Sequence, residues 1–229
     1  MSSVFEGALG WVASRRYLTV FIAIVGVLVA ISFVRGAPHV PVLLIVMLVG
    51  IAYGPLRLGS GPAWVKALFF LLLALRVAGL WIRSPDWVMV ADSAILGVFV
   101  LGSVAILRDV LTQPMVGLDT IVGGCSVYLL VGICFGIAFS LIESIIPGSF
   151  LVGGQPVDPE YMHRLPELVY LSFVVLTSVG FGDILPISRP ARGLVMMEAI
   201  FGQLYLAILV ARLVSLNSSR ASGDHGPRT

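Results

Sequence analysis

Long apolar stretches constrain this chain more than any other feature of its sequence. Six of them are long enough to cross a bilayer as helices, which takes roughly 17 to 25 mostly apolar residues. Their limits are 17–34, 40–57, 64–82, 88–107, 119–142 and 190–214. Only 11% of all residues are charged, whereas a soluble domain carries about 25%. The sequence therefore predicts an all-α integral membrane protein with six transmembrane helices.

A shorter apolar segment, residues 165–176, departs from this pattern of full spans. Pro166 and Glu167 suit the first turn of a helix, because Pro needs no N–H bond there and an acid complements the helix dipole. About ten apolar residues follow, which is half of what a span requires. We expect the segment to enter the membrane and return, as an irregular backbone does only beside protein or a water-filled cavity.

The seven residues that follow, 177–183, read TSVGFGD. Gly180 and Gly182 stand at alternate positions, and glycine adopts left-handed backbone angles without steric cost. A strand that alternates in handedness can turn successive carbonyl oxygens toward one axis, and the Ser178 hydroxyl would add another oxygen. The segment is therefore expected to replace the water shell of a dehydrated cation. The negative end of the preceding half-helix would also favour a cation.

The TSVGFGD segment resembles the filter signature of potassium channels, which is usually written TVGYG followed by Asp. A Pro follows Asp183 by three residues, Arg192 follows it by nine, and Gly202, at the place of the family's hinge glycine, follows it by nineteen. The resemblance covers residues 119–214. It implies a homotetramer in membrane lipid that binds K⁺ and needs no other cofactor. We call residues 177–183 the filter segment.

The resemblance also assigns roles to individual residues of the filter segment. It implies that K⁺ binds the carbonyl oxygens of Ser178, Val179, Gly180 and Phe181, with Gly182 completing the strand and Thr177 and Asp183 supporting it. Ser replaces the commoner Thr, so the innermost site lacks the methyl group that fixes the side-chain rotamer. Phe replaces Tyr, so a hydroxyl that would tie the filter to nearby helices is missing. We expect a filter prone to collapse or inactivation.

The last span carries the candidate cavity and gate residues. By position these are Gly202, Gln203, Leu206, Val210 and Val214. Gly202 permits either bending or close helix packing. Gln203 would line the aqueous cavity or bond a neighbouring helix, and we favour the cavity. The three apolar residues could form a constriction that closes by dewetting.

Glu198 lies one turn before Gly202, at the expected depth of the filter. An ionisable group within a span is costly and is usually functional. We expect Glu198 to lie behind the filter, bonded to the pore helix or the Ser178 region, and to make conduction sensitive to proton concentration.

The predicted spans divide the chain into five parts. These are a cytoplasmic segment at 1–16, a peripheral four-helix domain at 17–107, an amphipathic interfacial linker at 108–118, a pore domain at 119–214 and a disordered tail at 215–229. Basic side chains favour an orientation with both termini in the cytoplasm. The resemblance suggests a plasma membrane. We expect no soluble ligand-binding domain.

The fourth span decides whether this six-span architecture senses voltage. A sensor needs several regularly spaced basic residues, but this span has none before Arg108 at its end. We therefore expect no conventional voltage gating. Arg76 of the third span and Asp92 of the fourth would lie at similar depth and form a structural ion pair.

Other classes fit the sequence less well. An intramembrane protease needs a base near its nucleophile, but all three histidines fall outside the predicted spans. A transporter would show paired broken helices, and one re-entrant segment is found. No basic run indicates nucleic acid. Cys125 and Cys134 lie on opposite faces of one predicted helix and suggest neither a disulfide nor a metal site. A non-selective cation channel and a non-conducting scaffold remain as alternatives.

Overall fold

The computed structural model describes residues 16–33, 67–68, 70–71, 74–75, 85–113, 117–159 and 161–223. Its helices are α2 (Arg16–Phe33), α5 (Pro85–Thr112), α6 (Leu118–Ile145), α7 (Tyr161–Leu176) and α8 (Arg189–Gly223). Its strands are β1 (Phe150–Val152), β2 (Gln155–Pro156) and β3 (Ile184–Pro186). Within the described residues, three helices are long and apolar enough to cross a membrane, in α5, α6 and α8.

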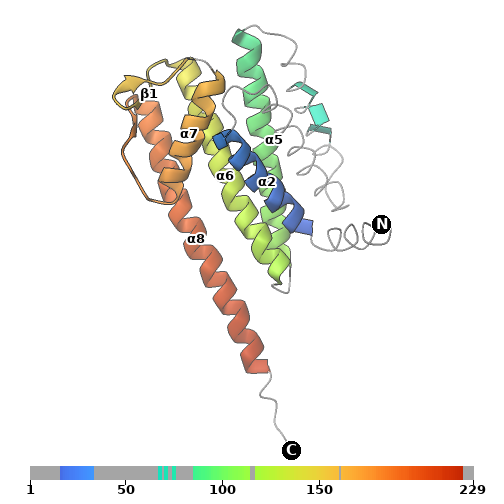
Figure 1. Ribbon diagram of the computed structural model, residues 1–229. Coiled ribbons are helices and arrows are strands. Elements are labelled where there is room, and N and C mark those ends of the chain that lie inside the picture. Colours follow the sequence, from blue (N-terminus) through green and yellow to red (C-terminus); the bar gives the residue numbers. More distant parts are fainter. Residues whose placement is uncertain are drawn as a thin grey trace, which may run out of the picture.

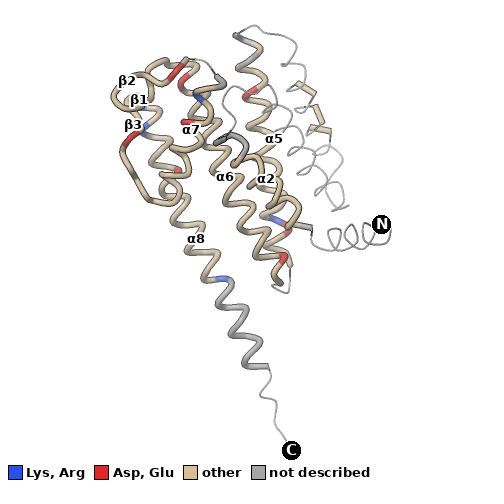
Figure 2. The backbone as a smooth tube through the Cα atoms, in the orientation of Figure 1, with Lys and Arg blue, Asp and Glu red and all other residues tan. Residues whose placement is uncertain are grey.

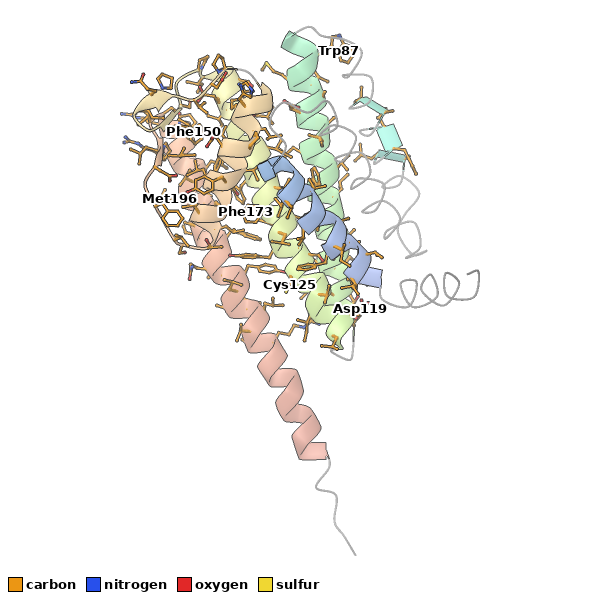
Figure 3. All side chains as sticks on the ribbon, viewed as in Figure 1. Trp87, Asp119, Cys125, Phe150, Phe173 and Met196 are labelled. Atoms are coloured by element: carbon orange, nitrogen blue, oxygen red, sulfur yellow. The ribbon has the colours of Figure 1, made fainter. Side chains whose placement is uncertain are left out.

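Helix α6 lies at the centre of the described structure and contacts α2, α5, α7 and α8 (Figure 1). Two glycines on α6 allow the short helix α7 to approach closely. A Cβ atom at Gly136 would lie 2.7 Å from the Cα of Val169, and one at Gly132 would lie 2.8 Å from the ring of Phe173. Phe173 lies between α7 and α6 (Figure 3). Helix α7 therefore packs closely against α6, because these two glycines leave no side chain between the helices.

A small antiparallel sheet pairs the chain before α7 with the chain after it. Its strand order is β2-β1-β3. β1 and β2 are connected through Gly153 and Gly154, which both have positive φ, as the tightest hairpin turns require. Leu151 pairs with Leu185 across β1 and β3. The ring of Phe150 packs 5.3 Å from that of Phe139 of α6, measured between centroids. The all-α prediction missed this sheet, which fixes the end of the filter segment to the loop before α7.

The limits of three predicted segments differ in the structure. Helix α7 begins at Tyr161 rather than at Leu165, so Pro166 lies inside it. Helix α5 continues to Thr112, into the predicted linker at 108–118. Helix α8 continues to Gly223, into the predicted disordered tail. α5 and α6 pack side by side (Figure 1).

Two of the expected spans lie wholly or largely outside the described residues. They are 40–57 and 64–82, and Arg76 belongs to the second. The predicted pair with Asp92 is therefore still a prediction, although Asp92 itself is buried in α5. Charged residues of the described part lie mainly toward the helix ends (Figure 2). This distribution is the one that a bilayer requires.

Candidate functional site

The filter segment begins where α7 ends, and three helices meet at that point. The hydroxyl of Tyr128 in α6 donates to the carbonyl oxygen of Leu176, the last residue of α7, at 2.9 Å. Gly202 of α8 faces the same carbonyl, since a Cβ atom there would lie 2.5 Å from it. The Thr177 hydroxyl donates to the Phe173 carbonyl at 2.6 Å, which closes the last turn of α7. The start of the filter segment is therefore fixed by α6, α7 and α8 together.

The backbone of the filter segment alternates in handedness, as the spacing of its glycines predicts. Ser178, Gly180 and Gly182 have φ values of 59°, 61° and 76°. Ser178 is the position that glycine spacing alone does not reveal, because a non-glycine residue rarely adopts a positive φ.

The amide groups of the filter segment turn back toward α7. The N–H of Ser178 donates to Val175 O at 2.9 Å, and those of Val179 and Gly180 donate to Val174 O at 3.0 and 3.3 Å. Among the described residues, no backbone bond outside helices and strands ends on a carbonyl of residues 178–182. The N–H groups of Ser178, Val179 and Gly180 are thus bonded on the side of α7.

Asp183, the last residue of the filter segment, is held by two hydrogen bonds. The Tyr170 hydroxyl of α7 donates to Asp183 Oδ2 at 2.9 Å. The N–H of Gly153 in the hairpin donates to Asp183 O at 3.0 Å. Asp183 therefore supports the filter segment through both its side chain and its backbone. Phe181 is 70% exposed and adds no hydroxyl of its own.

Residues 127–219 match a family model described as an ion channel. These residues therefore form an ion-channel domain, and the match covers less than half of the chain. The match contains most of α6, all of α7 and the filter segment, and nearly all of α8, which confirms the family resemblance found in the sequence. An ion channel is a transport protein, so the chain is not an enzyme.

Protein LctB from Bacillus caldotenax is a relative of this channel at 28% identity. The alignment extends over 128 residues, which is 54% of this chain and 95% of that protein. No solved structure matches the channel.

Glu198 of the channel contacts α7, the helix before the filter segment, which is one of the two partners expected from the sequence. It is fully buried, and its Oε1 contacts the Ser172 hydroxyl of α7. The same hydroxyl lies 2.6 Å from the carbonyl oxygen of Gly132 in α6. A serine hydroxyl has one proton, so it can donate to only one of these two oxygens. Both contacts are hydrogen bonds when the Glu198 carboxyl carries a proton and donates to Ser172.

Gln203 contacts the filter segment near its start, at Ser178. Its side-chain Nε2 donates to Ser178 Oγ at 2.5 Å. The sequence favoured a cavity-facing position and offered a helix contact as the alternative, and neither included a bond to the filter itself. No pattern in the sequence gave this contact, because it depends on how closely α8 passes α7 at Gly202.

Gly202 acts as a point of close packing in this structure. Helix α8 runs through it without interruption, and its missing side chain accommodates the end of α7. Of the remaining gate residues, Leu206 and Val210 are exposed in the single chain. The side chain of Val214 lies outside the described residues.

Two buried charged residues connect the second half of α6 to the segments that follow it, and neither was selected from the sequence. Glu143 lies in the last turn of α6 and accepts hydrogen bonds from the backbone N–H groups of Gly148 at 2.6 Å and Phe150 at 3.0 Å. Arg164, expected in a loop, lies in α7 and donates from Nε to Ser140 at 3.1 Å and from Nη2 to Ser144 at 2.8 Å. An acid at the end of an apolar span was the available signal for Glu143.

Proposed function

We propose that this chain forms a potassium-selective channel that conducts K⁺ passively and is not conventionally voltage-gated. The alternation of φ at Ser178, Gly180 and Gly182 carries this proposal. Such alternation can turn successive carbonyl oxygens toward one axis, and the N–H groups of Ser178, Val179 and Gly180 are already bonded to the end of α7. Rings of such oxygens replace the hydration shell of K⁺. The ions would lie at the carbonyls of Ser178, Val179, Gly180 and Phe181, and no other cofactor is proposed.

A single chain provides one filter strand, so we propose a homotetramer with fourfold cyclic symmetry. The apolar stretch of α8, Arg189–Arg212, supports an assembly because only 11% of its most apolar window is buried in one chain. Met196 on this helix points away from the rest of the chain (Figure 3) and is 63% exposed. Val179 and Phe181 of the filter segment are also exposed. Neighbouring copies and lipid would cover these surfaces.

The proposed topology has six spans in a plasma membrane, with both termini in the cytoplasm. The start of α2 lies beside the start of α6, where the Tyr17 N–H donates to Asp119 Oδ1 at 3.2 Å. The end of α5 lies beside the later part of α8, where Arg212 Nη2 donates to Leu111 O at 2.7 Å. These contacts support placing both ends of the chain on one side. The proposed lack of voltage sensing follows from α5, which has no basic residue before Arg108.

A non-selective monovalent cation channel is the second candidate, because Ser178 and Phe181 depart from the commoner filter sequence. Replacing Phe181 with Tyr tests how much the missing hydroxyl matters. Currents of the Phe181→Tyr variant should decay more slowly than those of the wild type. Equal decay would mean that the bond between Tyr170 and Asp183 already supplies the necessary support.

The decisive experiment is a comparison of K⁺ and Na⁺ flux through the purified protein in liposomes, with barium as a blocker. The proposal predicts a barium-sensitive flux that strongly favours K⁺. Equal flux of the two ions would support the non-selective channel. A complete absence of flux across a range of pH and voltage would support a non-conducting scaffold.

A further inference from the structure

The contact between Gln203 and Ser178 joins helix α8 to the start of the filter segment. Gln203 follows Gly202, and the absence of a side chain at Gly202 brings α8 against Leu176 O. This close passage places the amide of Gln203 2.5 Å from Ser178 Oγ. Both side chains are exposed in the single chain, so they stand at the surface that faces other copies or the conduction path.

Ser178 needs an external restraint if its hydroxyl is to act as an ion ligand. A serine side chain is unbranched and changes its χ1 rotamer easily, whereas the second Cβ substituent of threonine restricts χ1. A hydroxyl oxygen has two lone pairs and one proton. The Gln203 N–H occupies one lone pair, which fixes the rotamer and leaves the second lone pair for a cation.

We propose that Gln203 is the positioning residue for the innermost cation site and a determinant of its selectivity. Its hydrogen bond supplies the restraint on Ser178 that β-branching would supply in a threonine. Ser178 and Gln203 together would therefore do what a single threonine does at this position in the commoner filter sequence. This inference rests on the proposed function, since it concerns a site for dehydrated K⁺.

The test uses the full chain in planar bilayers, with the K⁺-to-Na⁺ permeability ratio and the barium concentration for half block as readouts. Barium is added on the side of the inner helix ends, from which it meets the innermost site first. Gln203→Met keeps the length of the side chain and removes the donor. Gln203→Leu is made in parallel, so that the result does not depend on the packing of one replacement. Leu204→Met is the matched control on the next residue of α8.

Both Gln203 variants should lower the permeability ratio and should weaken barium block by about two- to tenfold, the range expected for one net hydrogen bond. Leu204→Met should leave both unchanged. In a Ser178→Thr background, Gln203→Met should change each readout by less than about twofold, because threonine restrains its own χ1. This rescue separates positioning of Ser178 from a general effect of polarity in the cavity.

Two results would overturn the inference while leaving the proposed function intact. One is a K⁺-selective wild type whose selectivity and block survive both Gln203 substitutions. The other is an equal loss in the Ser178 and Ser178→Thr backgrounds, which would assign the effect to cavity polarity. A wild type that conducts K⁺ and Na⁺ equally would instead overturn the proposed function, and this inference with it.

Discussion

The substitution Gly202→Ala tests how helix α8 positions the filter segment. An added Cβ would lie 2.5 Å from Leu176 O, whereas ordinary contact begins near 3.4 Å, so the two groups must separate by roughly 1 Å. Overpacking of this kind costs about 1–3 kcal/mol. Replacing glycine in a helix also gains about 1 kcal/mol. The free energy of unfolding should therefore fall by about 0–2 kcal/mol per subunit.

Gly193→Ala is the matched control for this prediction. Gly193 lies in the same helix, and a Cβ atom there meets nothing within 4 Å. Gly193→Ala should therefore show only the gain in stability from replacing a helical glycine. The free energies of unfolding of the two variants should then differ by about 1–3 kcal/mol per subunit. Unfolding of each variant in detergent, followed by tryptophan fluorescence, measures the difference.

A simple hinge role for Gly202 makes a different prediction from the packing role. Displacing Leu176 O should disturb the filter segment that follows it, so Gly202→Ala should lower the K⁺-to-Na⁺ flux ratio. Loss of a hinge would instead reduce channel opening and leave that ratio unchanged. A Gly202→Ala variant as stable and as selective as Gly193→Ala would refute the packing argument.

Three other predictions follow from single contacts. Tyr170→Phe removes the bond to Asp183, so currents should decay up to about tenfold faster; unchanged decay would exclude this tie as a support. Conduction by the wild type should fall as pH rises, since loss of the Glu198 proton leaves the single Ser172 proton to serve both Glu198 and Gly132 O, which costs one of these two hydrogen bonds. Glu198→Gln, which keeps a donor, should remove the dependence; an identical pH profile would contradict this reasoning. Arg212→Gln should lower the melting temperature without altering selectivity, because its contact with α5 lies far from the filter; a changed K⁺-to-Na⁺ ratio would argue against that separation.

The sequence was most informative where local backbone chemistry determines the structure. The end of α7 at Leu176 and the alternating backbone at Gly180 and Gly182 were predicted from the residues themselves, whereas the start of α7 was not. Glu198 also lies where its spacing from Gly202 placed it. These features depend on helix length and backbone freedom, which a sequence displays directly.

Contacts between distant segments were not predictable in the same way. The bond from Gln203 to Ser178 depends on the approach of α8 to α7, and the two backbone bonds to Glu143 depend on how the hairpin folds back. The extension of α5 into the expected linker was missed for a related reason. An amphipathic segment such as 108–112 can end a span or lie on the membrane surface, and its packing on α6 decides between them.

The measurement that tests the central claim most directly is the reversal potential of single channels with K⁺ on one side of a planar bilayer and Na⁺ on the other. The alternating filter backbone predicts a large reversal potential, with the sign of a membrane permeable to K⁺ and nearly impermeable to Na⁺. A reversal potential near zero in open, barium-sensitive channels would contradict it, and would mean that the ordered carbonyl oxygens do not discriminate between the two ions.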